Sequence, residues 1–210
     1  MRRDDMTVSD IKQRFEKDVA NHTMKIVHQD GVYRTIECRQ IGSVNYSFTI
    51  VTTPYYLAYM GDMGTYVFSR NTALDMLDFF RKTNRGEEIP YGYWKGKLEA
   101  GEYKQFDAQT AVTEAMEMLE QEESINFASC DYKSLDEIKE FLEYSAEDGE
   151  HEYFTVLSDL MDELEIDDWY ETCKRVYKPT FHYIWCCYAI LWAIAQYDSM
   201  TNKAETNEQV

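Results

Sequence analysis

His182 and Cys186 are four residues apart in the most apolar run of the chain, and Cys187 follows directly. If this run is a helix, the imidazole and the Cys186 thiol share a face, at a spacing that can hold two ligands of a zinc ion, with Cys173 as a third. The same pair could act as nucleophile and base, provided that the thiol is partly exposed. Buried cysteines in apolar helices are more often small core residues. We therefore expect core packing here, and no metal or cofactor.

Asp62 is a second candidate for chemistry, because it lies in the segment Gly61-Asp62-Met63-Gly64. Glycines permit a close approach between backbone and ligand. A phosphate-binding loop needs a following helix and usually a lysine, however, whereas strand-like sequence flanks this segment on both sides. The segment predicts a hairpin turn with Asp62 at its exposed tip. No GxSxG, HExxH or Walker-type motif occurs in the chain.

Acidic residues dominate one part of the sequence. Between Asp107 and Glu171 there are 22 acidic residues and two basic ones, a net charge of −20, whereas the other residues carry 17 acids and 19 bases, a net charge of +2. Such a stretch can be a solvated helical face that maintains solubility. It can also meet a basic partner or imitate nucleic acid, since duplex DNA presents one negative charge per about 1.7 Å. Direct nucleic-acid binding through this half is not expected, because like charges repel.

The candidate partner-binding residues are acids on two expected helices and aromatic residues after the expected sheet. Tyrosine and tryptophan are enriched at protein interfaces, although sheet packing explains the tyrosines within strands equally well. The acids are Glu114, Glu117, Glu120, Glu122, Glu123, Asp136, Glu137, Glu140 and Glu143, and the aromatic residues are Tyr91, Tyr93 and Trp94.

The hydrophobic pattern predicts an α+β fold. Residues 8–21 repeat apolar side chains at helical spacing, and Thr7 with Asp10 forms a capping-box pattern. Residues 24–69 alternate in the manner of an antiparallel meander of about five strands. A helix should then begin at Asn71 or Thr72, and residues 91–100 predict a short helix or an irregular segment.

The second half of the chain predicts helices. Asp107 and Ser134 are the expected caps of two of them, and residues 152–165 form another. The last helix, after Pro179, is apolar nearly all round, which predicts a buried position at the centre of the fold. We expect one domain, in which residues 1–106 hold the first helix, the sheet and the following helices, residues 107–201 form an acidic helical half around the buried last helix, and residues 202–210 are a disordered tail.

The cysteines and the apolar runs bear on location. The five cysteines form no CxxC pair and no even framework, which favours a reducing compartment. The apolar run from Tyr183 to Ala195 is shorter than the ~20 residues that span a bilayer, and no signal-peptide pattern opens the chain. We expect a soluble, cytoplasmic protein.

Several segments together resemble a group of uncharacterised accessory proteins encoded by phages and prophages. The segments are AYMGDMGTYVFSR, LDMLDFFR, YAILWAIAQYD and, near the N-terminus, DVANHTMKIVHQDGVYR. The resemblance covers most of the chain and implies a host-cell setting, but no catalytic residues. By analogy, small acidic phage proteins often disarm host defences such as restriction or CRISPR systems.

These observations lead to one main hypothesis and two alternatives. The main hypothesis is a phage counter-defence protein, of anti-CRISPR or anti-restriction type, that binds a host nucleic-acid-handling complex through an acidic, nucleic-acid-mimicking surface. The first alternative is a small intracellular enzyme with a site around Asp62 or the His182 and Cys186 face. The second is a phage housekeeping or assembly factor whose acidity serves solubility and whose contacts use the aromatic residues of 91–103.

Overall fold

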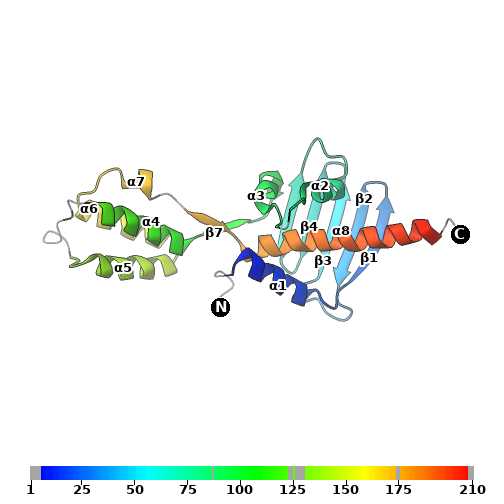
Figure 1. Cartoon of the computed structure of the whole chain (residues 1–210), viewed down its shortest axis with the longest axis horizontal. Coiled ribbons are helices and arrows are strands. Elements are labelled where there is room, and N and C mark those ends of the chain that lie inside the picture. The colour runs from blue at the N-terminus through cyan, green and yellow to red at the C-terminus, as the bar shows by residue number, and fades with distance from the viewer. Residues whose placement is uncertain (1–5, 87, 123–124, 126–130, 174–175, 208–210) are drawn as a thin grey trace. The chain divides into compact units, whose positions relative to one another are not determined.

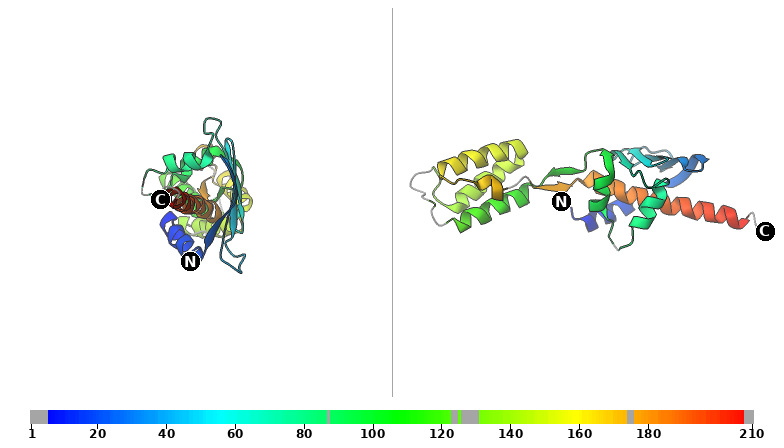
Figure 2. Two further views of the ribbon diagram at one scale, coloured as in Figure 1. Left: turned by 90° about the vertical axis from the view of Figure 1, so that its right-hand side faces the viewer. Right: turned by 90° about the horizontal axis from the view of Figure 1, so that it is seen from above.

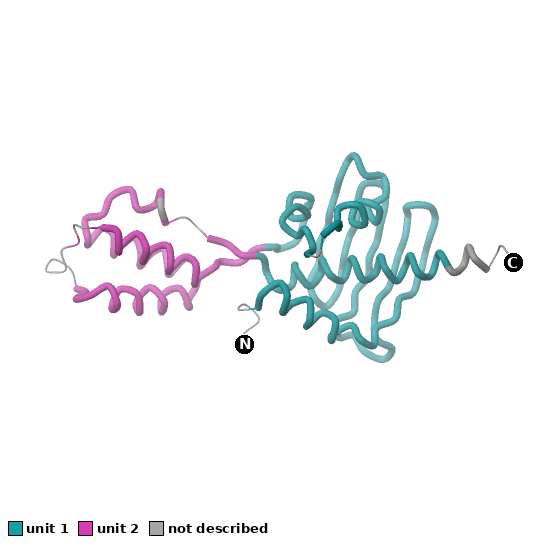
Figure 3. Tube along the Cα trace, viewed as in Figure 1, with its two compact units in different colours: residues 1–103, 179–210 teal, residues 104–178 magenta. Residues whose placement is uncertain are grey.

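The computed structural model of the chain describes residues 6–86, 88–122, 125, 131–173 and 176–207. The chain divides into two compact units (Figure 3). Unit 1 contains residues 1–103 and 179–210, and unit 2 contains residues 104–178. Each unit has its own hydrophobic core, so each is described by itself.

Unit 1 is built on a six-stranded antiparallel sheet whose strands follow one another in sequence order (Figure 1). The expected meander is therefore present, with one strand more than the five predicted. The additional strand lies in the segment 91–100, for which a helix or irregular structure was expected. The strands are β1 (Thr23–Asp30), β2 (Tyr33–Arg39), β3 (Phe48–Thr53), β4 (Tyr56–Gly61), β5 (Gly64–Ser69) and β6 (Leu98–Ala100).

The described helices of unit 1 lie on one face of this sheet (Figure 2). The covering helices are α1 (Val8–Asp18), α2 (Met76–Thr83) and α8 (Phe181–Asn207), and two short helical segments, α3 (Tyr91–Trp94) and η2 (Lys95–Lys97), precede β6. Alternate strand residues such as Ile50 and Phe68 point into the core and are fully buried. The expected buried last helix is present as α8, whose residues Tyr183 to Ile190 are almost all buried.

Local capping signals place the helix starts of unit 1. The predicted capping box of α1 is confirmed, because the Thr7 hydroxyl accepts from the Asp10 amide at 3.2 Å and the Asp10 carboxylate accepts from the Thr7 amide at 3.0 Å. The predicted start of α2 at Asn71 or Thr72 is wrong. Asp75 is the cap, and its carboxylate accepts from the Leu77 amide at 2.9 Å.

Unit 2 is a small helical body inserted between β6 and α8. Its helices pack their apolar stripes together, and Leu119, Leu142 and Leu157 are fully buried in the shared core. The predicted cap of α5 is confirmed, since the Ser134 hydroxyl accepts from the Glu137 amide. The elements are β7 (Lys104–Phe106), α4 (Ala108–Gln121), α5 (Leu135–Glu147), α6 (Glu150–Glu163), α7 (Trp169–Thr172) and β8 (Tyr177–Pro179), of which β7 and β8 form a two-stranded sheet.

The chain passes from unit 1 to unit 2 at residue 104 and returns to unit 1 at residue 179. The first boundary lies near residue 104, close to the expected one at 106. The last helix, which was assigned to the acidic half, clusters with the sheet instead. It also continues to Asn207, where a disordered tail from residue 202 was expected. No helix within the described ranges has the length and apolarity needed to cross a membrane.

Candidate functional site

The negative charge of the chain is concentrated in unit 2. Residues 104–178 contain 22 acidic and six basic residues, a net charge of −16, whereas the residues of unit 1 contain 17 acidic and 15 basic residues, a net charge of −2. The division found from backbone contacts therefore coincides with a division of charge. Unit 2 is thus strongly acidic, and unit 1 is nearly neutral.

Of the acidic residues singled out from the sequence, seven lie on α4 and α5 and Glu122 directly follows α4, and most of these are exposed. On α5, buried side chains such as Ile138 and Leu142 form one stripe, so the acids at other positions must face solvent. The first turn also favours acids, because the helix N-terminus carries a partial positive charge. The exposed acids of the predicted set are Glu117, Glu120, Glu122, Asp136, Glu137, Glu140 and Glu143, while Glu123 lies outside the described residues.

Glu114 differs from the other acids of the set. It is half-buried, and its charge acts on Cys173, which lies just after α7. Burial raises the pKa of the Cys173 thiol to about 11, and the charge of Glu114 contributes to this rise. Glu114 is therefore less accessible to a partner than the other described acids of the predicted set.

A groove runs between α4 and α5, with a volume of about 570 Å³. Four of the predicted acids line it, and Glu147, which the sequence analysis did not single out, joins them. Val112, Met116 and Ala146 are almost completely buried at its floor. The acidic lining residues are Glu117, Glu120, Asp136, Glu143 and Glu147.

One further acid of α5, Glu137, stabilises the start of the helix. The Glu137 carboxylate accepts a hydrogen bond from the Lys133 amide at 2.8 Å, which fixes the chain at the start of the helix. Glu137 and Glu140 are not among the residues that line the groove. The structure thus separates the eight described acids of the predicted set into four that line the groove and four that lie elsewhere.

The aromatic segment after the sheet is largely part of the core. Trp94 is fully buried, its ring packs edge-on against Phe80 at 4.8 Å, and its indole N–H donates to the Thr83 hydroxyl at 2.9 Å. It cannot form the contact surface that was expected of it. Tyr91 is half-buried, and Tyr93 is exposed, although its hydroxyl accepts from Arg70 at 3.1 Å. Of the three predicted residues, only Tyr93 is exposed, with 46% of its surface accessible to solvent.

A second hollow, of about 350 Å³, brings together two residues that the sequence analysis had considered separately. Asp62 and His182 both line it, along with Glu102 and Thr180. Asp62 already has a structural role, because its carboxylate accepts from the Tyr46 amide at 2.8 Å and so holds the loop before β3. Among the described residues, no three histidine, cysteine or acidic side chains gather closely enough to bind a metal ion.

The cysteine face of α8 is unsuited to nucleophilic chemistry. Cys186 and Cys187 are fully buried, and the Cys186 thiol donates to the Met63 carbonyl at 3.5 Å. Burial raises the pKa of both thiols well above the ordinary value, which disfavours the reactive thiolate. His182 is exposed, so the two members of the predicted pair have opposite environments. Cys173, the proposed third zinc ligand, belongs to the core of unit 2.

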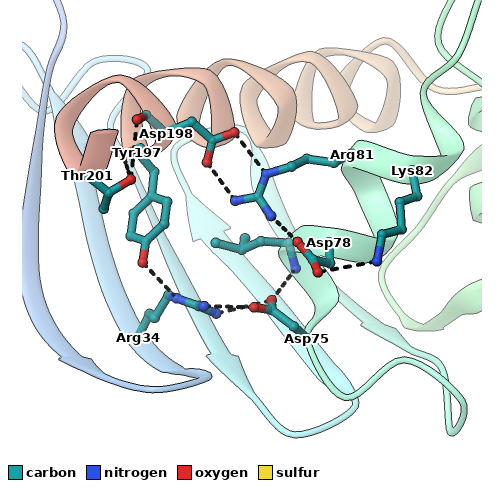
Figure 4. A network of polar contacts seen from close by, with 9 residues as sticks. Arg34, Asp75, Asp78, Arg81, Lys82, Tyr197, Asp198 and Thr201 are labelled. Atoms are coloured by element: carbon teal, nitrogen blue, oxygen red, sulfur yellow. Dashed lines mark hydrogen bonds and ion pairs between the residues drawn. The ribbon is translucent and has the colours of Figure 1, made fainter. Parts of the chain in front are cut away.

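A cluster of charged residues joins β2, α2 and α8 (Figure 4). Arg34 donates to both carboxylate oxygens of Asp75, at 2.7 and 3.1 Å, and to the Tyr197 hydroxyl at 3.2 Å. Arg81 on α2 donates twice to Asp198 on α8, at 2.6 and 2.8 Å. Each arginine is thus paired with a carboxylate, and these ion pairs connect β2, α2 and α8. Sequence reasoning missed this cluster, although Arg34 occupies an inward position of β2, in phase with Ile36.

Comparison of the chain with protein-family models, with curated proteins and with solved structures gave no significant match in any of the three.

Proposed function

We propose that this protein is a non-enzymatic binding protein whose acidic unit occupies a basic, nucleic-acid-handling surface of a partner protein. In the setting of a phage or prophage, this is the action of a counter-defence inhibitor. The observation that carries the proposal is the coincidence of fold and charge, because unit 2 holds −16 of the net charge of −18. Charge that served solubility alone would have no reason to follow the boundary of a folded unit.

The charge density of α5 supports the comparison with nucleic acid. Asp136, Glu137, Glu140, Glu143 and Glu147 are all exposed on this helix. Between the first and the last of them the helix rises roughly 16 Å, at 1.5 Å per residue. This corresponds to about one carboxylate per 4 Å, which is close to the spacing of about 3.4 Å between phosphates along one DNA strand.

A rigid scaffold makes this charge useful for binding. The acids project from helices that share a hydrophobic core, so their positions are fixed before a partner arrives. A concentrated negative field accelerates the approach of a basic surface and weakens with added salt. The partner would then be blocked because the acidic helices and its nucleic acid compete for the same lysines and arginines.

The first experiment is affinity capture from a bacterial lysate with the full chain as bait, washed at low and at high salt. We expect recovery of a nucleic-acid-handling complex at low salt, its release at high salt, and its displacement by added duplex DNA or RNA. A partner that stays bound at high salt and ignores nucleic acid would contradict the proposal.

A matched pair of charge-reversed variants tests whether the acids act by position. Asp136→Lys, Glu140→Lys and Glu143→Lys together change α5, and Glu16→Lys, Glu88→Lys and Glu102→Lys together make the same change in net charge on exposed positions of unit 1. We expect the α5 variant to lose the captured complex and the unit 1 variant to retain it. Equal losses from both, with folding verified by circular dichroism, would show that net charge alone matters.

A further inference from the structure

The groove between α4 and α5 combines two kinds of surface. Val112, Met116 and Ala146 form an apolar floor, and they remain 5%, 8% and 6% exposed. Carboxylates line the rim on both sides, so the floor is reached between two acidic walls. A surface built only to imitate nucleic acid would need the walls and not the floor. The floor is therefore an apolar surface of small exposed area that apolar side chains of a partner can contact.

The length of the groove fits a helix. Its lining runs from Ala108 to Glu120 on α4 and from Leu135 to Glu147 on α5. Each wall is therefore roughly 18 Å long, or about three turns at 1.5 Å per residue. The volume of about 570 Å³ is too small for a whole helix, whose diameter with side chains is about 10–12 Å. It has room for a row of apolar side chains from a helix that lies along the groove.

The negative charge of the residues that line the groove determines which charge a bound helix must carry. Among the described residues that line the groove, five are acidic and Lys139 alone is basic. The Lys139 ammonium lies 3.9 Å from a Glu143 carboxylate oxygen, and both side chains are more than half exposed, so this pair is weak. The described lining residues carry five acids and one lysine, a formal net charge of −4. A neutral or acidic helix would remove water from these carboxylates without supplying a counter-charge, which is unfavourable.

We propose that the groove binds a basic amphipathic helix of the partner protein, about 12 residues long, as a refinement that rests on the function proposed above. Apolar side chains at positions i, i+4 and i+7 contact the floor, and lysines and arginines on both flanks pair with the rim. Partner recognition then has two components. Charge attracts the helix and weakens with salt, whereas the apolar contacts fix its register and persist at high salt.

The test uses a fluorescent synthetic peptide of about 14 residues with leucines at i, i+4, i+7 and i+11 and lysine, arginine and alanine elsewhere. The control is a peptide of the same composition in scrambled order, which has the same charge but no apolar face. Fluorescence anisotropy with the full chain should give an affinity at least about tenfold tighter for the amphipathic peptide. Equal affinities would overturn the proposal, since charge alone would then explain binding.

Two tryptophan substitutions locate the bound peptide. Thr113 is exposed at the groove, and its hydroxyl donates to the Gln109 carbonyl at 2.8 Å. Thr155 is equally exposed on α6, outside the groove lining, and its hydroxyl donates to the His151 carbonyl at 2.9 Å. Thr113→Trp fills the groove without altering charge and should weaken the amphipathic peptide at least about tenfold, whereas Thr155→Trp should leave its affinity within about twofold. Equal effects of the two substitutions would overturn the proposal.

The outcomes separate this inference from the proposed function. If the Thr113→Trp variant still captures a nucleic-acid-handling complex in a salt-sensitive way, the acidic surface binds the partner and the groove takes no part in recognition. If the full chain captures no such complex, the proposed competition with nucleic acid is ruled out. The helix-binding groove is retained if the amphipathic peptide is still preferred and Thr113→Trp still blocks its binding.

Discussion

The ion pair between Arg34 and Asp75 should be a major stabilising contact of unit 1, and a double-mutant cycle can measure it. Asp75→Asn removes the negative charge but keeps a capping side chain for α2, because Asn and Asp cap helices about equally well. Arg34→Met removes the guanidinium and keeps a long, adaptable side chain. The double variant combines both changes, so the cycle isolates the energy of the pair from that of the cap.

The magnitude follows from the burial of the two side chains, which are 9% and 21% exposed. Breaking a buried pair from one side costs about 3–5 kcal/mol, because the other charge remains buried and unpaired. After Asp75→Asn, the Tyr197 hydroxyl still accepts from Arg34, so the lower end applies. After Arg34→Met, the more exposed Asp75 keeps contact with water and its hydrogen bond from the Leu77 amide, so the loss falls below this range. We expect losses of about 3 kcal/mol for Asp75→Asn, about 2 kcal/mol for Arg34→Met and about 3 kcal/mol for the double variant, which gives a coupling energy of about 2 kcal/mol.

Urea denaturation followed by tryptophan fluorescence provides the assay. Trp94, Trp185 and Trp192 lie in unit 1 and Trp169 lies in unit 2, so the signal reports mainly on the unit that contains the pair. The slope of the free energy of unfolding against urea concentration should be the same for all four proteins. A coupling energy below about 0.5 kcal/mol is the additivity expected of independent sites, and it would refute the assigned role of the pair.

The remaining predictions concern pH, glycine geometry and thiol reactivity. Burial acts to raise the pKa of Asp75, but the hydrogen bonds and charge of Arg34 outweigh it and lower the pKa. The stability that the ion pair contributes is therefore fully present above the unfolded pKa of about 3.9, and it is lost as the pH falls through the lower folded pKa. The stability difference between the native protein and Asp75→Asn, measured by urea denaturation, should therefore shrink below about pH 4. Gly101 and Gly149 share a φ of +117°, but a Cβ at Gly101 would lie 2.5 Å from the Tyr66 ring, whereas nothing lies within 4 Å at Gly149. Gly101→Ala should cost at least about 1 kcal/mol more than Gly149→Ala in the same assay, and equal costs would rule out the clash. Cys38, Cys173, Cys186 and Cys187 are buried, and burial raises the pKa of Cys38 to about 12. No more than one of the five thiols should react rapidly with a disulfide reagent at pH 8, and rapid reaction of two or more would contradict the described core.

Local patterns in the sequence predicted the elements well where neighbouring residues decide the outcome. The capping box of Thr7 and Asp10 involves only the first turn of α1, and the alternation of residues 24–69 reflects a sheet with one covered face. The start of α2 could not be predicted in this way. Asn71, Thr72 and Asp75 are all good capping residues, and the pairing of Asp75 with Arg34, 41 positions away, favours the last of them.

The sequence indicated which acids of α5 are exposed, but not that several of them line a groove. Helical spacing indicates which acids of α5 face solvent, but the groove exists only because α4 packs beside α5, a contact that no local pattern specifies. Trp94 was misassigned because α3 has four residues, too few for a periodic pattern to reveal its buried side. The apolar pattern of α8 predicts burial from all sides, yet it contains no signal that identifies the sheet as its partner.

The connections of unit 2 to the rest of the chain bear on how this unit could be gained or lost in evolution. The chain enters through β7 and leaves through β8, which pair with each other, and the Asp107 amide donates to the Val176 carbonyl at 2.9 Å. Entry and exit are thus adjacent, as in domains that are inserted within a loop of an older fold. An acidic module attached in this way can be gained, lost or exchanged by recombination without rerouting the strands that precede it or the helix that follows. The sheet and α8 can keep their connections whatever sequence the inserted helices take.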